Sequence, residues 1–401
     1  MTTTVRPLTV DDAEASRRLG WEAFGFPAKP PTDPASATLD TPGRHFFGAF
    51  HDDRLAARMA WRDYDSWFGG RLVRTAGIAS VTVAAEDRGT GLLTPLFAEA
   101  LRDAHAAGAV ISTLFPSAAG IYRRFGYELV SDYVTVSLPS AVVAAVPRPA
   151  PPAGVRTRRA GAADLPALRE VYDTWAAAQN GPLSRRGVSF PASDAELLEE
   201  FSGFTVAVAG DDSVCGYTSW NRGQGYGPGS KLEVSDLIAL SADGYRALLA
   251  ALGSFAPVTP TTTIDTSGND LARLLLASTD WAVSESSPYG LAVLDVVGAL
   301  TARDFPPGVY AQLPFRLRGM ALPQQDGTYV LQVADGASVC ERSRTGDDRT
   351  LAPRGLALLY AGVQSCANLR FAGLLTGGDP RHDPLWDCLF AGRPMHIRDY
   401  F

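Results

Sequence analysis

The sequence is short of lysine and of positive charge as a whole. Only two of its 36 basic residues, Lys29 and Lys231, are lysines, and the formal net charge is −7. Proteins that bind nucleic acid need a basic footprint to contact the phosphates. The charge balance therefore argues against a nucleic-acid partner.

Metal-binding and disulfide patterns are also missing. The four cysteines form no CxxC pair, and the five histidines show no HxxxH or HExxH spacing. These absences speak against a zinc site, and so few cysteines in a chain of this length exclude a disulfide framework. No GxSxG motif supports a serine hydrolase. We expect no bound metal.

Long apolar runs do not occur. No stretch approaches the roughly 20 apolar residues of a membrane span, and residues 1–7 lack the apolar core of a signal peptide. We therefore expect no membrane span and a cytoplasmic location. Apolar residues make up 46% of the chain and charged residues 20%, as in ordinary globular domains. At roughly 150 residues per domain, 401 residues correspond to two or three domains.

Two segments of the chain begin in the same way. Each starts like a short strand with an arginine, Arg6 or Arg158, and six residues later has an aspartate, Asp12 or Asp164. An aspartate there can cap a following helix, and helices are predicted over residues 13–24 and 165–179. Because internal repetition changes the interpretation of the whole fold, we interpret the two segments as the starts of two domains of one type.

The domain boundaries are inferred from a proline-rich segment and from a change in the spacing of turns. A segment rich in alanine, valine and proline, residues 139–154, separates the two similar units. From about residue 290 the spacing of turns changes, with strands expected over residues 292–300, or a strand after a helix, and over residues 328–333 and 338–342. We predict domains over residues 1–145, 154–289 and 290–401, the last with an α+β fold.

A glycine-containing loop carries the strongest chemical signal. A β-branched strand candidate over residues 78–83 leads through Arg88-Gly-Thr-Gly91 into an apolar-striped helix. A helix start exposes unpaired backbone N–H groups and partial positive charge, and glycines let a ligand approach the backbone closely. The loop therefore favours a phosphate or pyrophosphate. An ordinary strand-to-helix turn is the alternative, since the motif is neither GxGxxG nor a Walker loop.

The residues around this loop resemble a known family. The stretch from Val81 to Leu93 resembles the acetyl-CoA pyrophosphate loop of the GNAT N-acetyltransferases, Arg/Gln-x-x-Gly-x-Gly/Ala; Arg88 and Gly91 match, while Leu93 departs. The block Ser117-Ala-Ala-Gly-Ile-Tyr-Arg-Arg-Phe-Gly-Tyr resembles the GNAT segment in which a helix carries a tyrosine before a Gly-Phe/Tyr pair.

More narrowly, the two blocks together look like the Eis (enhanced intracellular survival) family. The resemblance extends loosely over the whole chain, through Tyr172-Asp-Thr-Trp175, Leu359-Tyr360-Ala-Gly and an aromatic last residue. It implies an α/β (α+β) fold of two tandem GNAT-like domains, the second degenerate, and a sterol-carrier-protein-like domain. At the equivalent place in the second unit, residues 237–246 contain no Arg-x-x-Gly, and Asp243 would repel a phosphate.

The activity implied by the resemblance is acetyl-CoA-dependent N-acetylation. The expected substrates are amines of polycationic small molecules such as aminoglycosides, at one or more positions, for which an acidic pocket would be suited. The family also implies a homo-hexamer. Lysine side chains and one dedicated biosynthetic amine are alternative substrates. A lipid-binding protein with acetyl-CoA as a regulatory ligand is the alternative from another class.

Residue roles carry over from the family position by position. Tyr122 would protonate the departing thiolate as general acid, and Phe401 would supply its terminal carboxylate as base. From the residues alone, a tyrosine in the position of Tyr122 is more often a packing residue than an acid, and a chain terminus is rarely catalytic. Substrate contacts are expected from Phe24, Asp399 and Tyr400, where an acid one position before Tyr400 departs from the family pattern. The expected acetyl-CoA contacts are Val81, Thr82 and Val83 on the pantetheine arm, Arg88, Gly89, Thr90, Gly91, Leu92, Leu93 and Thr94 on the pyrophosphate, and Ser117 and Ala118 near the thioester.

Overall fold

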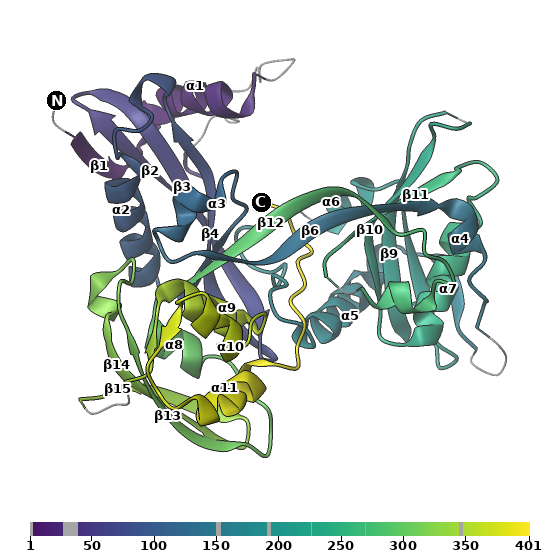
Figure 1. Cartoon of the computed structure of the whole chain (residues 1–401). Coiled ribbons are helices and arrows are strands. Elements are labelled where there is room, and N and C mark those ends of the chain that lie inside the picture. Colours follow the sequence, from purple (N-terminus) through teal and green to yellow (C-terminus); the bar gives the residue numbers. More distant parts are fainter. Residues whose placement is uncertain are drawn as a thin grey trace.

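A twelve-stranded sheet runs through the whole molecule and is built by both of the similar units (Figure 1). The computed structural model describes residues 3–26, 39–149, 154–190, 194–225, 227–268, 270–344 and 348–401, so the prolines at the end of the predicted linker lie outside the described residues. In spatial order the strands are β1 (Thr3–Pro7), β2 (Arg44–His51), β3 (Arg54–Phe68), β4 (Arg71–Val83), β5 (Ile111–Leu114), β12 (Ala282–Val293), β6 (Glu128–Pro139), β11 (Thr261–Thr266), β10 (Lys231–Ala239), β9 (Val214–Arg222), β8 (Gly203–Val208) and β7 (Arg156–Arg159).

The first unit covers its part of the sheet with amphipathic helices. Helix α2 (Leu93–Ala106) buries one apolar stripe that includes Leu96, Phe97 and Leu101 against β2 and β3, while its other residues face outward. Gly108 follows with φ +92°, a conformation that suits glycine after a helix. Helix α1 has the predicted bounds, Ala13–Phe24, and α3 (Ala119–Arg123) is short.

A strand from the end of the second unit completes the sheet of the first. Strand β12 lies between β5 and β6, pairing with β5 over Gly290–Val293 and with β6 over Ala282–Leu291. The other edge of β6 pairs with β11 of the second unit. Figure 1 shows the resulting β6–β12 ribbon crossing from one unit to the other.

The strand expected over residues 292–300 is wrong. Strand β12 ends at Val293, and helix α8 (Val296–Thr301) follows at once. The Asp295 side chain accepts a hydrogen bond from the backbone N–H of Gly298 and so caps this helix. The apolar run is a buried helix that sequence periodicity cannot separate from a buried strand over so short a length.

The two units repeat one local motif in full. Arg6 forms two hydrogen bonds to Asp12, at 2.7 and 2.9 Å, and Arg158 forms two to Asp164, both at 2.7 Å. Each aspartate also accepts a backbone N–H three residues earlier, from Thr9 or from residue 161. The aspartates therefore cap short 3-10 turns, whereas the sequence predicted that they cap α1 and α5 (Leu165–Ala177) directly.

The Arg–Asp pair of this motif makes the free energy of unfolding depend on pH in the acidic range. The Arg6 guanidinium lowers the pKa of Asp12 to about 2, below the ordinary value of 3.8. A depressed carboxyl pKa stabilises the fold above the unfolded pKa, and this contribution is lost as pH falls. We expect the free energy of unfolding to fall as pH is lowered from about 4 to about 2, measured by urea denaturation. The fall should be smaller in Asp12→Asn; an unchanged pH profile would contradict the assignment.

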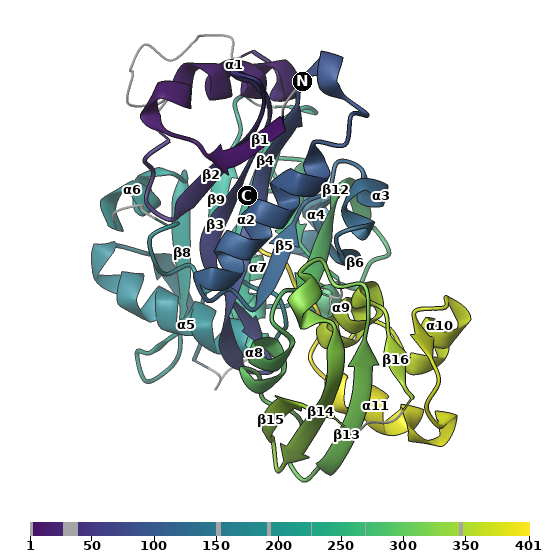
Figure 2. The ribbon, with the colours of Figure 1, turned by 90° about the vertical axis from the view of Figure 1, so that its left-hand side faces the viewer.

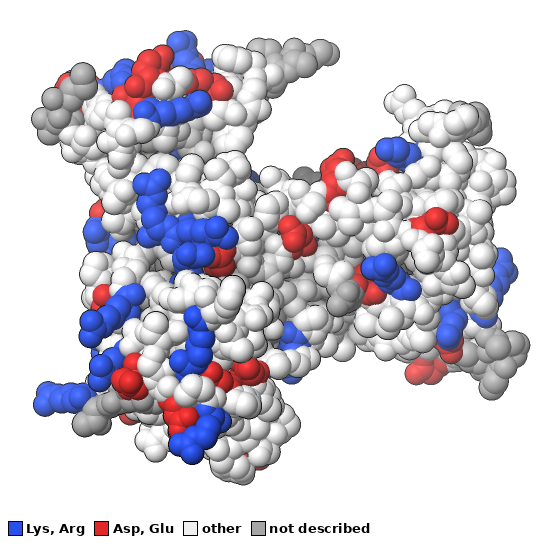
Figure 3. All heavy atoms as spheres, viewed as in Figure 1, with Lys and Arg blue, Asp and Glu red and all other residues white. Residues whose placement is uncertain are grey.

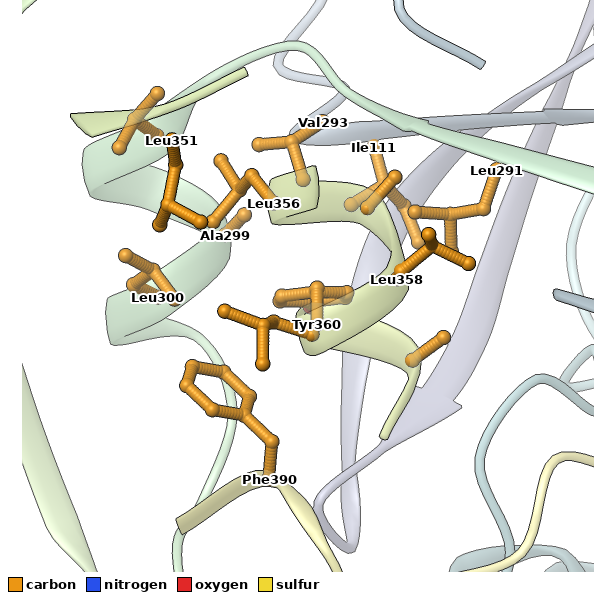
Figure 4. Packing of buried hydrophobic residues seen from close by; sticks show 14 of the residues in the cluster. Ile111, Leu291, Val293, Ala299, Leu300, Leu351, Leu356, Leu358, Tyr360 and Phe390 are labelled. Atoms are coloured by element: carbon orange, nitrogen blue, oxygen red, sulfur yellow. The ribbon is translucent and has the colours of Figure 1, made fainter. Parts of the chain in front are cut away.

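The third unit shares its core with the central sheet. Its five-stranded sheet has the order β15-β14-β13-β16-β17, and helix α9 (Pro353–Ala361) is buried nearly all round. Figure 4 shows Leu358 of α9 close to Ile111 and Leu291 of the central sheet, and Leu356 of the same helix near Val293. The remaining elements are β13 (Tyr310–Leu317), β14 (Gly327–Ala334), β15 (Ala337–Arg342), β16 (Thr350–Leu351), β17 (Leu375–Thr376), α10 (Cys366–Phe371) and α11 (Asp383–Phe390).

Three further helices lie in the second unit and before it. Helix α4 (Ser140–Ala144) follows β6 directly, α6 (Asp194–Glu199) precedes β8, and α7 (Ala242–Gly253) packs against α4 and β9. Figure 2, turned by 90°, shows the third unit below the first. Among the described residues, no helix has the length and apolar character needed to cross a membrane.

Candidate active site

The glycine loop before α2 has room for a ligand. Gly89 and Gly91 have φ values of +82° and +88°, and a Cβ added to either would meet no heavy atom within 4 Å. No side chain caps the start of α2 at Leu92. The loop therefore presents glycine backbone and an open helix N-terminus, which fits the phosphate cradle expected from the sequence.

The buried carboxylate of Asp87 is the centre of the contacts that hold this loop in place. The Asp87 carboxylate accepts hydrogen bonds from Arg54 at 2.7 Å and from the His51 ring at 2.9 Å. The Thr90 hydroxyl donates to the backbone oxygen of Asp87 at 2.6 Å. Arg88 extends over the surface and donates to the backbone oxygen of Val83 at 3.4 Å. Its guanidinium therefore lies beside the strand end that the sequence assigns to the pantetheine arm.

The equivalent position in the second unit is closed. The Ser241 hydroxyl accepts a hydrogen bond from the Gly244 N–H at 3.1 Å, so the protein itself caps α7. Asp243 pairs with Arg246 at 2.9 Å on the same turn. A helix start with its own cap and a carboxylate is a poor site for a phosphate.

Strands β4 and β5 pair over only a short length. Their parallel register joins residues 75–78 of β4 to residues 111–114 of β5. Beyond Ile78, β4 continues to Val83 with an irregularity at Ser80, whose φ is +58°. The backbone of Val81–Val83 thus continues past the end of β5, next to the glycine loop. These are the residues expected along the pantetheine arm.

Tyr122 lies in a pocket of aromatic rings at the end of β5. It is 7% exposed, and its ring centroid is 5.9 Å from that of Phe97 and 6.4 Å from that of Tyr127. Burial raises the pKa of its phenol, while a hydrogen bond with the Ser117 side chain opposes the shift. The phenol is therefore protonated at neutral pH and can act as a proton donor. Ala118 precedes α3 in extended conformation.

The last residue packs against the first unit. The Phe401 ring lies 5.0 Å from that of Tyr64, 5.4 Å from that of Phe115 and 6.4 Å from that of Tyr289, between centroids. A Cβ on Gly77 would stand 2.9 Å from the Phe401 ring and 2.6 Å from the Tyr64 ring. Glycine at this position of β4 leaves the space that the terminal ring occupies.

A buried ionic network fixes the residues just before the terminus. Arg185 donates to Asp399 at 2.8 Å and to Asp236 at 2.6 and 3.1 Å. Arg398 donates to Asp236 at 3.0 Å and to the backbone oxygen of Asp265 at 2.5 Å. We call these four side chains, Arg185, Asp236, Arg398 and Asp399, the tail clamp. It ties the tail of the third unit to β10 of the second.

The clamp shifts the pKa values of its two carboxyl groups in opposite directions. Although burial opposes ionisation, Arg185 and Arg398 lower the pKa of Asp236 far below its ordinary value. The pKa of Asp399 is raised, because burial and the charge of Asp236 outweigh its contact with Arg185. The Tyr217 hydroxyl donates to Asp236 at 3.1 Å. The clamp is therefore a balanced cluster in which removal of one charge leaves another buried without a partner.

Removal of one clamp arginine should be strongly destabilising. Arg185→Met leaves Asp236 and Asp399 with one cation between them, and breaking a buried pair in this way costs about 3 kcal/mol of unfolding free energy. The neighbouring Arg186→Met is the matched control, because its pair with Asp173 is largely exposed and exposed pairs contribute about 0–1 kcal/mol. Urea denaturation compares the two variants, and equal losses would contradict the clamp.

A cavity of about 550 Å³ opens beside the clamp. The terminal residues Asp399, Tyr400 and Phe401 line it together with β3 of the first unit and α5 of the second. Phe115, which follows β5, touches the Phe401 ring, and the next residue, Pro116, lines a small cavity beside Tyr122. Tyr122 and the chain terminus thus approach the Phe115–Pro116 dipeptide from different sides.

The expected substrate contacts have different surroundings. Tyr400 lines the cavity with its ring 4.4 Å from that of Phe115, between centroids. Asp399 also lines it, yet its carboxylate is bonded to Arg185. Phe24, at the end of α1, is 68% exposed and is not among the described residues that line the cavity.

Several cavity residues were not anticipated. Arg62 and Tyr64 project from β3, and Arg185 and Asp236 come from the second unit. Alternation along residues 54–68 is the one signal that could have placed Arg62 and Tyr64 on a common face. No motif marks Arg185 or Asp236, which meet only in the folded chain. Within the described ranges, no three His, Cys, Asp or Glu side chains gather as metal ligands would.

Arginines also gather on the outer surface near Tyr122. Glu128 receives hydrogen bonds from Arg123 of α3 at 2.8 Å and from Arg354 of α9 at 2.7 Å. Figure 3 shows a group of basic side chains in the left half of the molecule, in the region of α3, among residues of both signs. The contact joins the helix of Tyr122 to the third unit.

Comparison with family models divides the chain into three parts. Residues 4–130 match a model described as an acetyltransferase (GNAT) domain, and residues 181–292 match a second model with the same description. Residues 296–397 match a sterol carrier protein domain. The three matches occur in the order that the sequence predicted.

Relatives match most of the chain. An uncharacterized N-acetyltransferase of Streptomyces coelicolor is 32% identical over 327 residues, covering 76% of this chain and 75% of its own. The N-acetyltransferase Eis of Mycobacterium tuberculosis is 26% identical over 382 residues, covering 90% of this chain and 87% of its own. A GCN5-related N-acetyltransferase from Kribbella flavida has a similar structure, with a TM-score of 0.82 and 30% identity over 100% of this chain and 98% of its own. Eis1 from Mycobacterium abscessus has the same fold, with a TM-score of 0.76 and 23% identity over the full length of both chains.

Proposed function

The chain belongs to the GNAT N-acetyltransferases, with the three-domain organisation of the Eis family, and on that premise we propose that it acetylates an amine bound in the cavity of the chain terminus. One observation carries this assignment. The terminal Phe401 is fixed in a cavity lined by both GNAT-like units, beside the strand end that leads to Tyr122.

Acetyl-CoA is the proposed acetyl donor. The uncapped start of α2 and the open space at Gly89 and Gly91 support binding of its pyrophosphate by residues 88–94. The edge of Val81–Val83 that extends beyond the pairing with β5 supports contact with the pantetheine arm. Ser117 and Ala118 lie beside Tyr122, near the expected thioester. When bound, acetyl-CoA supplies the acetyl group, and CoA leaves as the free thiol.

Two groups of the chain move protons in the proposed mechanism. The amine arrives as an ammonium and must lose a proton before its nitrogen attacks the acetyl carbonyl. The terminal carboxylate of Phe401 accepts this proton, directly or through water. As the new C–N bond forms and the C–S bond breaks, the Tyr122 phenol gives its proton to the departing sulfur. The proton that the acetylated nitrogen then loses returns to the phenol through solvent. The proton held by the terminal carboxyl is released to solvent, so the reaction yields the amide, the thiol and one proton.

The tail clamp has a positioning role in this proposal. A terminal carboxylate has an ordinary pKa of about 3.5 and is a weak base for an ammonium in water. Burial of the tail between the two units and the packing of Phe401 over Gly77 bring it next to the substrate. Proximity of this kind supplies much of the rate enhancement that a weak base alone would lack.

Polycationic amines such as aminoglycosides, acetylated at one or more positions, are the substrate class expected from the family. Lysine side chains and a single biosynthetic amine are the alternatives. The densely packed core of the third unit (Figure 4) favours a structural role for that domain over lipid binding. A homo-hexameric assembly, a cytoplasmic location and the domain bounds 1–145, 154–289 and 290–401 form part of the same proposal.

The direct test is release of thiol from acetyl-CoA by protein with an unmodified C-terminus. We expect release that depends on the added amine, with the acetylated product identified by mass. Kanamycin, neomycin, a lysine peptide and small monoamines form the panel, and several acetyl groups on one aminoglycoside would establish multiple positions. Acetyl-CoA binding without release in the presence of any amine would contradict the proposal and favour the lipid-binding alternative.

A further inference from the structure

Three of the four described acidic side chains that line the cavity pair with arginines of the protein. Asp236 and Asp399 belong to the tail clamp, and Asp173 pairs with Arg186. Of the described carboxylate side chains that line the cavity, this leaves Glu200, which is exposed. The same lining contains five arginines: Arg62, Arg169, Arg185, Arg186 and Arg398. The described lining therefore lacks the excess of acid that a polycation requires.

One of these arginines has no counter-ion among the described residues. Arg62 on β3 is half-buried, and its guanidinium donates to the Tyr64 hydroxyl at 3.2 Å. The adjacent acid, Asp63, points to other partners and pairs with His45 and Arg74. Arg62 thus presents an uncompensated positive charge to the cavity that contains Phe401.

A second arginine stands behind the first. Arg44 on β2 lies directly opposite Arg62 in the antiparallel register, and no described carboxylate forms an ion pair with it. Burial and the charge of Arg62 lower the pKa of Arg44. Like charges opposite each other destabilise a sheet, so this pair weakens the fold unless an anion binds to it. Two neighbouring guanidinium groups with free donors suit a carboxylate, which binds a guanidinium through two hydrogen bonds.

The remaining walls of the cavity are largely aromatic. Tyr64, Tyr133, Phe190, Tyr400 and Phe401 line the space next to Arg62. Such walls favour a flat or apolar molecular body with few polar groups, held in orientation by a small number of charged contacts.

We propose that the substrate is an amine that also carries a carboxylate on an aromatic or apolar body, with the carboxylate bound by Arg62 and supported by Arg44. The inference rests on the proposed acetyl transfer and replaces its polycationic substrates by an amino-acid-like class. The carboxylate binds at the arginine pair, and the amine at the other end of the body points to the terminus at Phe401. Each added positive charge on a substrate weakens its binding, because it faces the same arginine pair.

A matched pair of substrates tests this assignment. The two probes are 4-(aminomethyl)benzoate and its neutral amide, 4-(aminomethyl)benzamide, which differ only in the carboxylate, and kanamycin serves as the polycation. We expect kcat/KM for the acid to exceed that for the amide by about tenfold or more, as a charge-assisted contact provides. Arg62→Gln should remove this preference, so that the ratio of kcat/KM for the acid to that for the amide falls to about one whatever the change in the rate with the amide. Arg102→Gln, on the outer surface of α2 and paired there with Glu99, is the control and should retain the preference.

The outcomes separate this inference from the proposed function. Equal rates with acid and amide, a preference unchanged in Arg62→Gln, or faster acetylation of kanamycin than of either probe would overturn the carboxylate site while acetyl transfer still stands. If no amine promotes thiol release, titration calorimetry of the acid and the amide against the native and Arg62→Gln proteins decides. If the acid binds more tightly than the amide, and this difference disappears in Arg62→Gln, the carboxylate site stands although the proposed acetyl transfer fails. If there is no such difference, both the carboxylate site and the proposed acetyl transfer are overturned.

Discussion

Tyr122→Phe should lower kcat for acetyl transfer about 100-fold, the lower part of the range that a positioned general acid contributes. The substitution removes only the phenolic oxygen, and the ring keeps its packing against Phe97 and Tyr127. Affinity for acetyl-CoA should remain, because the glycine loop that binds its phosphates lies at the start of α2. Steady-state kinetics and calorimetric titration of acetyl-CoA measure the two effects separately.

The matched control is Tyr127→Phe. Tyr127 is buried and hydrogen-bonds Ser112 at 2.6 Å, so its replacement tests the loss of a buried hydroxyl without the loss of the proposed acid. We expect lower stability but nearly native kcat. A native kcat in Tyr122→Phe, or equal losses in both variants, would rule out the acid role of Tyr122.

The pH profile gives an independent check on the same residue. Because burial raises the pKa of Tyr122 above its ordinary value of 10, the phenol stays protonated through the neutral and mildly basic range. Deprotonation of the Tyr122 phenol should therefore not lower kcat of the native protein at any pH below about 10. The fall of kcat at low pH would instead be determined by protonation of the catalytic base, which has a lower pKa than the phenol.

Extension of the chain by a single glycine after Phe401 should reduce kcat/KM about 100-fold. The extension converts the carboxylate of Phe401 into an amide and moves the new carboxylate by about 3.5 Å, the length of one residue. Displacements of 1 Å at a reacting group already cost about 100-fold in rate. The fold should be unaffected, since the tail clamp acts through Arg398 and Asp399.

The control for this variant is a glycine inserted after Met1, at the other end of the chain, where the first described strand, β1, is not part of the described cavity lining. Circular dichroism and the denaturation midpoint should be the same for both extended proteins. Full activity with the C-terminal glycine would remove the carboxylate from the mechanism. Equal losses of activity in the two proteins would point to an indirect effect of handling or assembly.

Local patterns predicted much of the fold. The helix over residues 13–24 has the predicted bounds, and the strand, glycine loop and helix around residue 90 occur in the expected order. The family and the fold class of two GNAT domains and a sterol-carrier-like domain are confirmed. These features depend on residues close together in sequence, where periodicity and caps carry the information.

Such local patterns could not predict which residues pair over long distances in the sequence. The insertion of β12 between β5 and β6 leaves no local trace, because a strand alternates in the same way whichever neighbour it has. The tail clamp joins Arg185 and Asp236 to residues more than 150 positions later, and no spacing rule connects them. An acidic pocket would suit the polycationic substrates that the resemblance implies, whereas Asp173, Asp236 and Asp399 of the cavity are paired with arginines.

The placement of β12 also affects how the first unit can fold while the chain is being synthesised. Strand β5 ends at residue 114, and the strand that covers its free edge begins at residue 282. At roughly 5–20 residues per second, a ribosome needs roughly ten to thirty seconds to make the intervening chain. Throughout that interval the nascent first unit exposes an unpaired edge, the feature that promotes wrong pairing and aggregation. A fold completed by its later half therefore favours slow, assisted maturation over independent folding of the catalytic unit.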